Sequence, residues 1–202
     1  MLACQAVLYY SRDVLQDAAV PPSHIRLANA GVGLVKFVGA LLSTAAIDRL
    51  GRRALLLGGT VVMLAGHLGL AVSFGMLRGG AAPPGEVAIA DEGAGGDMTG
   101  VLALSSLLIF ILAWNVSWAG LMLTVASELL PQEVRGLGCG VAYALYWLLS
   151  FIISSTLEST FENVGTGETF ALYGGATSFA LVFVWVCVPE TKGVALSACA
   201  TA

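Results

Sequence analysis

Charged side chains are scarce in this chain of 202 residues. Only 11% of the residues are Asp, Glu, Lys or Arg, whereas a soluble domain carries about 25%. The hydrophobic share is 57% and the mean hydropathy is +0.87. The net charge of −4 excludes the clustered basic surface of a nucleic-acid-binding protein. This composition indicates a membrane protein, and it excludes an ordinary soluble enzyme and a disordered segment.

The chain also has few residues that could form a metal site or a catalytic centre. None of its cysteines has the Cys-x-x-Cys spacing, and all lie in or beside apolar segments: Cys4, Cys139, Cys187 and Cys199. We therefore expect buried free thiols and neither a disulfide framework nor a metal site. His24 and His67 have no Ser or Asp arranged with them for nucleophilic catalysis, so we expect no enzyme and no cofactor. His67 lies within an apolar segment and is expected to pack against neighbouring helices.

Apolar residues are gathered into blocks of about 20, the length that crosses a bilayer as a helix. The predicted spans are Ile25–Ile47, Ala54–Leu77, Val101–Leu123, Leu137–Leu157 and Thr169–Val188. Met1–Tyr10 is also apolar, but as a helix it would reach only about 15 Å, half the hydrocarbon thickness. It has no signal-peptide features, so we expect the chain to begin inside a transmembrane helix. The predicted fold is an all-α integral membrane protein with about six transmembrane helices.

The loops predict an orientation in the membrane. Basic residues of alternate loops would share one face, which the positive-inside rule makes cytoplasmic: Arg49, Arg52, Arg53, Arg135 and Lys192. The tail, residues 189–202, would then be cytoplasmic. The connection Arg78–Thr99 is rich in Gly, Ala and Pro, carries four acids, and is predicted to be an outer loop that separates two groups of three spans.

Several polar side chains lie where hydrocarbon is expected. Lys36 stands at the centre of its span, so it should face either a wet cavity or a partner acid in an interhelical pair. Asn115 is at mid-span, Gln5 precedes the pair Tyr9-Tyr10, and the span Leu137–Leu157 contains Tyr146-Trp147. Amides and aromatic rings that face a cavity suit a neutral polyhydroxylated ligand. The alternative for each aromatic ring is packing in a membrane-interface belt.

Charged residues at the predicted cytoplasmic helix ends form a second candidate site. They are Asp48, Arg49, Arg52, Arg53, Glu128, Arg135 and Glu190. Such groups could form a network that closes one face of a transporter in one state and separates in another. The alternative is that they only set the topology and end the helices.

These segments together resemble the C-terminal half of a sugar porter of the major facilitator superfamily. The resemblance is carried in order by Ala6-Val-Leu-Tyr-Tyr-Ser11, Asp48-Arg-Leu-Gly-Arg-Arg53, Ser127-Glu-Leu-Leu-Pro131 with Arg135-Gly136, and Pro189-Glu-Thr-Lys-Gly193. It covers nearly the whole chain. It implies a twelve-helix fold of which residues 1–202 form the second half, with its first helix truncated.

The resemblance also implies roles for the candidate residues. Substrate-binding positions of the family correspond to Gln5, Tyr9, Tyr10, Lys36, Asn115, Tyr146 and Trp147. The family's inner-gate salt bridges correspond to the charged residues named above. The chain departs from the family where Gly120 replaces a Pro at a bend and Leu123 replaces a Trp. Lys36 replaces an Asn, as in a plant plastid and vacuolar branch of the family.

The implied function is transport of a neutral hexose or pentose by alternating access, with or without proton coupling. The implied partners are a monosaccharide, the lipid bilayer and a matching N-terminal six-helix half. Without that half, Lys36 and Asn115 would be uncovered, so we expect no transport by this chain alone. The alternative is a non-transporting membrane protein, either a sugar sensor or a truncated remnant of a transporter. The motifs leave the membrane open among plasma, vacuolar and plastid membranes.

Overall fold

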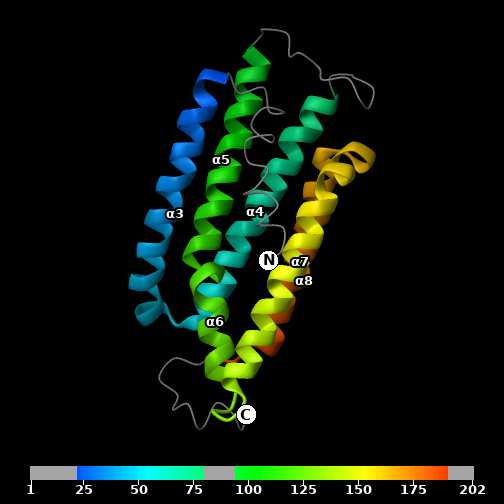
Figure 1. Ribbon diagram of the computed structural model, residues 1–202. Coiled ribbons are helices and arrows are strands. Elements are labelled where there is room, and N and C mark those ends of the chain that lie inside the picture. Colours follow the sequence, from blue (N-terminus) through cyan, green and yellow to red (C-terminus); the bar gives the residue numbers. More distant parts are fainter. Residues whose placement is uncertain (1–21, 80–93, 191–202) are drawn as a thin grey trace.

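The computed structural model describes residues 22–79 and 94–190, and within them all regular structure is α-helical. The helices form a bundle whose axes run roughly along one direction (Figure 1). Their bounds are α3 (Pro22–Leu50), α4 (Arg52–Gly79), α5 (Ala94–Val116), α6 (Trp118–Leu129), α7 (Arg135–Val164) and α8 (Thr166–Cys187).

Five segments of this bundle are long and apolar enough to cross a membrane. α5 and α6 form a single span, Gly100–Leu129. The five predicted spans are therefore confirmed as helices in a multi-pass, all-α arrangement. The short predicted helix at Met1–Tyr10 lies outside the described residues.

The best-packed part of the bundle is the contact of α4 with α5 on one side and α8 on the other. Leu56 and Leu70 of α4, and Leu107, Phe110 and Ile111 of α5, are almost completely buried there. Lipid tails are as apolar as these side chains, so close packing holds membrane helices together. Small residues on α4 make this packing possible.

Glycines allow α4 and α5 to approach each other closely. A Cβ atom on Gly66 would lie 2.8 Å from Cβ of Phe110, and one on Gly59 would overlap the side chain of Ser117. Gly58, next to Gly59, has open space around it. Of these α4 glycines, Gly59 and Gly66 are therefore required by packing and Gly58 is not.

The helices extend beyond the apolar blocks from which they were predicted. α4 continues to Gly79 and α5 begins at Ala94, so residues 94–99 are helical although they were expected in the outer loop. α7 continues to Val164, well beyond the predicted end at Leu157. The hydropathy pattern marks the edge of the hydrocarbon, whereas helical hydrogen bonding continues into the headgroup region.

The span Gly100–Leu129 is distorted at Ser117, between α5 and α6. Ser117 has φ −107° and ψ −80°, outside the helical range. Backbone hydrogen bonds still flank it, from Ser117 N to Ala113 O at 3.1 Å and from Leu121 N to Ser117 O at 3.2 Å. The span therefore changes local geometry without ending.

The cysteines differ from their predicted environment. Cys139 and Cys187 are both free, as expected. Cys187 is exposed on α8 and Cys139 is only half-buried, so the expectation of buried thiols is wrong for Cys187. A thiol is a weakly polar group that tolerates a lipid-facing surface, so an apolar segment does not imply burial. Cys4 and Cys199 lie outside the described residues.

Candidate functional site

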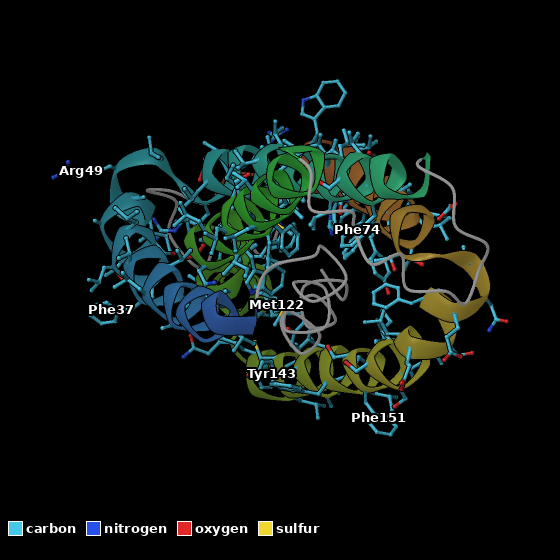
Figure 2. All side chains as sticks on the ribbon, turned by 90° about the horizontal axis from the view of Figure 1, so that it is seen from above. Phe37, Arg49, Phe74, Met122, Tyr143 and Phe151 are labelled. Carbon is cyan, nitrogen blue, oxygen red and sulfur yellow. The ribbon has the colours of Figure 1, made fainter. Side chains whose placement is uncertain are left out.

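Lys36 lies at the edge of the α3 face that packs into the bundle. It follows the buried Val32 by four residues and precedes the buried Ser43 by seven, which places all three on one helix face. Phe37 and Leu41, further around the helix, are 64% and 58% exposed, and Figure 2 shows Phe37 pointing outward. Lys36 itself is half-buried. It therefore lies between the buried and the exposed faces of α3.

Asn115 lies where α5 crosses α3. A Cβ atom on Gly39 of α3 would lie 2.7 Å from Cβ of Asn115, so the two backbones are nearly in contact. Lys36 is one helical turn from Gly39, and so one turn from this crossing. Asn115 donates its Nδ2 proton to Ile111 O at 2.8 Å, a bond that does not use the amide oxygen. Among the side chains that the structure describes, no carboxylate forms an ion pair with Lys36.

A cluster of aromatic rings lies on α7. Tyr146 and Trp147 have ring centroids 5.5 Å apart, and Tyr143 lies 6.0 Å from each of them. Ser150, on the same face, is buried, whereas Trp147 is 44% exposed. Tyr143 was not among the predicted site residues, although its spacing of three and four residues from the other two rings is a signal for a shared helix face.

The predicted substrate-binding residues thus fall into two described groups. Asn115 lies at the crossing of α3 and α5, with Lys36 one helical turn away on α3. Tyr146 and Trp147 lie together on α7, which is on the opposite side of the bundle from α4 (Figure 2). Gln5, Tyr9 and Tyr10 lie outside the described residues.

The predicted charged residues gather at one end of the bundle, where the α3–α4 turn, the α6–α7 turn and the end of α8 lie together (Figure 1). Arg52 Nε lies 3.4 Å from Glu128 Oε1, and Arg52 also donates to Ile47 O at 3.4 Å. Both charged side chains are mostly covered, with 21% and 16% exposure. This ion pair joins the first turn of α4 to the last turn of α6.

Glu190 joins the chain after α8 to the start of α4. Its carboxylate accepts hydrogen bonds from the backbone N–H groups of Arg52 and Arg53, at 3.0 and 3.2 Å. A carboxylate is favourable at this position because the first N–H groups of a helix have no intrahelical partner. Gly51 has φ +87°, and a Cβ there would lie 2.8 Å from Glu190 Oε2. Glycine is required at this turn for both reasons.

The remaining predicted network residues are placed differently. Arg53 donates from Nη2 to Trp185 O at 2.5 Å. Arg135 donates from Nε and Nη2 to Leu130 O, at 3.4 and 3.3 Å, and so stabilises the α6–α7 turn. Arg49 is exposed, and the side chain of Asp48 lies outside the described residues. The structure therefore connects Arg52, Arg53, Glu128 and Glu190 at this end.

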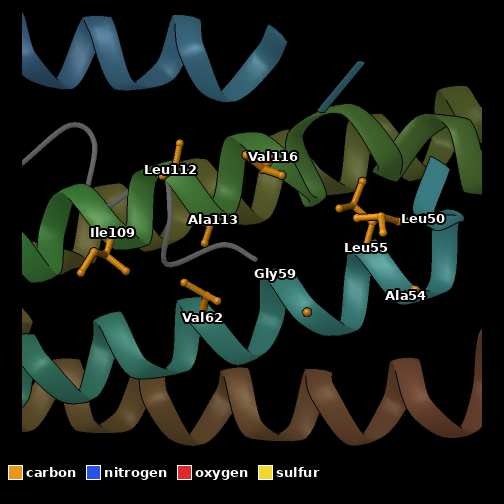
Figure 3. A pocket seen from close by; sticks show the side chains of 10 residues that line it. Leu50, Ala54, Leu55, Gly59, Val62, Ile109, Leu112, Ala113 and Val116 are labelled. Atoms are coloured by element: carbon orange, nitrogen blue, oxygen red, sulfur yellow. The ribbon is translucent and has the colours of Figure 1, made fainter. Parts of the chain in front are cut away.

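A pocket of about 400 Å³ opens elsewhere, between α4, α5 and the end of α3 (Figure 3). Its lining consists entirely of aliphatic side chains and glycines, including Leu50, Val62, Ile109 and Leu112. Sugar hydroxyl groups need hydrogen-bonding partners, which these side chains cannot supply. The pocket is therefore not the sugar site.

His67 is buried between α4, α5 and α8, as its place in a span predicted. Its Nδ1 lies 3.1 Å from Thr177 Oγ1, and its ring centroid lies 4.5 Å from that of Phe110. It packs between helices and is distant from the charged end of α4. In the described parts of the chain, no group of three or more His, Cys, Asp or Glu could hold a metal ion.

A family model described as "Sugar (and other) transporter" matches residues 1–202. The chain belongs to this sugar transporter family of the major facilitator superfamily. Its members are transporters and not enzymes, so the expectation of a non-enzymatic membrane protein is confirmed.

Individual relatives agree with this assignment. The facilitated trehalose transporter Tret1 of Culex quinquefasciatus is 30% identical over 193 residues, covering 95% of this chain and 34% of that protein. The glucose transport protein of Synechocystis is 27% identical over 190 residues, covering 94% of this chain and 39% of that protein. The solved proton:xylose symporter XylE, bound to 6-bromo-6-deoxy-D-glucose, matches with a TM-score of 0.77 and 25% identity. That match covers all of this chain and 41% of XylE. The chain thus spans about a third to two fifths of the length of these three proteins.

Proposed function

We propose that this chain forms the C-terminal half of a transporter that carries a neutral hexose or pentose across a membrane by alternating access. The relatives named above transport trehalose, glucose and xylose according to their names, which supports a carbohydrate substrate. The order of motifs along the chain supports the assignment to the C-terminal half.

The observation that carries this proposal is the position of Lys36 and Asn115. Both lie within membrane-spanning helices and both are half-buried, with Asn115 at the crossing of α3 and α5 and Lys36 one helical turn from that crossing. Polar groups at this depth are costly unless they face water, a partner or a substrate. The amide of Asn115 supplies a hydrogen-bond acceptor for a sugar hydroxyl, and Tyr146 and Trp147 supply aromatic faces for the ring of the sugar.

A matching N-terminal six-helix half would supply the other wall of the cavity. Transporters of this kind hold the substrate near the midplane between two halves that rock around it. Alternating access then requires contacts that form at one end and break at the other. The ion pair of Arg52 with Glu128, and the contact of Glu190 with the start of α4, would form the inner gate. In this proposal the gate and the C-terminus face the cytoplasm.

The test is sugar binding and uptake by the full transporter containing this chain, reconstituted in liposomes. Asn115→Ala should weaken binding by roughly tenfold, the effect of losing one or two hydrogen bonds, while the protein stays folded. Asn163→Ala is the matched control, because Asn163 also donates its amide to the carbonyl four residues earlier, Ser159 O at 2.7 Å, but is exposed at the end of α7. Equal sugar affinity of Asn115→Ala and the parent protein would remove Asn115 from the site.

The isolated chain tests the requirement for a second half. We expect no saturable sugar uptake by liposomes that contain residues 1–202 alone, since these helices form only one wall of the cavity. Saturable uptake by this chain alone would contradict the proposal of a matching half. Sugar binding without uptake in the full-length protein would favour a sugar sensor, and absence of both would favour a transporter remnant.

A further inference from the structure

The contact between α6 and α4 has a buried hydrogen bond at one end and the Arg52–Glu128 ion pair at the other. Trp118, in the first turn of α6, donates from Nε1 to Thr60 Oγ1 of α4 at 2.9 Å. Thr60 in turn donates its hydroxyl proton to Leu56 O at 2.6 Å. Thr60 is 1% exposed and Trp118 is 9% exposed. Both polar groups are thus satisfied without water.

The two helices run in opposite directions along matching faces. On α4, Arg52 and Thr60 are two turns apart and lie on one face, about 12 Å from each other along the axis. On α6, Trp118 and Glu128 are ten residues apart, about 15 Å along the axis. The buried Leu121 and Val125 lie between them on the same face. The position of Trp118 on Thr60 therefore determines whether Glu128 reaches Arg52.

The distortion at Ser117 lies directly before Trp118, at the start of α6. Helices usually bend at proline, at glycine or serine, or where a side chain inserts into the hydrogen-bonding pattern, and no proline lies between Gly100 and Leu130. Ser117 Oγ bonds to Ala113 O at 2.6 Å, a local bond that bends helices only slightly. Ser117 fits against Gly59, the residue before Thr60. The geometry at the bend is thus set largely by contacts with α4.

We propose that Thr60 and Trp118 are positioning residues, whose hydrogen bond fixes the direction of α6 and so aligns Glu128 with Arg52. Neither residue belongs to the candidate substrate site or to the charged network. The consequence for gating rests on the proposed transport function. The position of α6 can be measured without transport, so the two proposals can fail separately.

A disulfide between α3 and α6 can report the position of the first turn of α6. A Cβ atom at Gly120 would lie 3.1 Å from Ser43 Oγ, so a cysteine pair at these two positions is within reach of disulfide geometry. The experiment compares oxidation rates of Ser43→Cys/Gly120→Cys in membranes containing the full protein, with native cysteines replaced by alanine. Thr60→Val keeps the shape of the side chain and removes its hydroxyl group.

Thr60→Val and Trp118→Phe should each lower the cross-linking rate by about fivefold, the population change expected from losing one buried hydrogen bond. Thr60→Ser should retain the parent rate, because it keeps the hydroxyl. Thr177→Val is the matched control, since Thr177 is also buried and bonds to a ring nitrogen across helices, His67 Nδ1 at 3.1 Å, but lies away from α6. It should leave the rate unchanged. An unchanged rate in Thr60→Val, or an equal loss in Thr177→Val, would overturn the proposal.

Discussion

The membrane spans of this chain differ greatly in the share of each span that is buried by the other described helices. Half of the span Gly100–Leu129 is buried inside the bundle, whereas only 6% of Arg135–Val164 is. Gly100–Leu129 comprises most of α5 and all of α6, and it packs against α4. Arg135–Val164 is α7, which exposes large side chains such as Phe151 and Leu137. The two regions are similar in length and hydropathy, so composition does not account for the difference.

The difference indicates that some helices of the bundle mainly provide packing and others mainly carry candidate substrate residues. The contact of α4 with α5 and α8 is a scaffold, with glycines that admit the neighbouring helix and side chains that fill the space. α3 and α7 are more open, and they carry Lys36 and the aromatic cluster of Tyr143, Tyr146 and Trp147. Candidate substrate contacts thus lie mainly on the sparsely covered helices, where a matching half would complete the cavity.

The largest expected difference between the two spans is in the unfolding free energy lost when a phenylalanine is truncated to alanine. Phe110 is fully buried on α5, and Phe151 is 69% exposed on α7 and points outward (Figure 2). Phe110→Ala should lower the free energy of unfolding by about 3 kcal/mol, because it leaves a cavity. Phe151→Ala should change it by less than about 0.5 kcal/mol. Thermal unfolding in detergent measures both, and equal losses would show that α7 is packed as tightly as α5.

Neighbouring glycines give a sharper test of the α4–α5 contact. Gly59→Ala would place a methyl group against Ser117, whereas Gly58→Ala meets open space. We expect Gly59→Ala to cost about 1–3 kcal/mol of unfolding free energy, the range for overpacking. Gly58→Ala should be neutral or stabilising, since alanine favours helix over glycine by about 1 kcal/mol. If the two substitutions shifted the unfolding temperature equally, the close approach at Gly59 would be excluded.

Much of the fold was predictable because hydropathy directly reports which segments contact lipid. The five described spans were all predicted, with errors at their ends, as at Ala94 and Val164, where helices leave the hydrocarbon. The packing was less predictable. Gly58 and Gly59 are identical in sequence terms, and only the rotation of α4 about its axis decides which of them faces α5.

The candidate sites were predicted to different extents. Arg52, Glu128 and Glu190 do meet, because short turns bring the ends of alternate helices to one side of the bundle. The partner of Arg135 was not predictable, since a carbonyl group such as Leu130 O leaves no signal in the sequence. Thr60 was missed for a similar reason, because one hydroxyl in an apolar span is usually satisfied by its own helix.

The charged end of the scaffold should contribute little to stability and more to the balance between states. Glu128→Gln removes the charge that pairs with Arg52, and Glu133→Gln is the control, an exposed carboxylate in the adjacent turn. A partly exposed ion pair contributes at most about 1 kcal/mol, so both variants should stay folded. Only Glu128→Gln should increase labelling of a cysteine placed at Ser127. Equal labelling in the two variants would remove the ion pair from the gate.

Lys36 should contribute least to stability and still matter for transport. Lys36→Met keeps most of the length of the side chain and removes its charge. Lys36 forms no ion pair with a described side chain, so the variant loses none there, and it gains an apolar group inside the membrane. The unfolding temperature should stay equal or rise. Sugar uptake should change in rate or in pH dependence, because a charge that faces the cavity acts on the substrate, on water or on the opposite half. Lys36→Arg keeps the charge and serves as the control. If Lys36→Met transports like the parent at every pH, Lys36 has only a structural role and α3 does not contribute it to the substrate site.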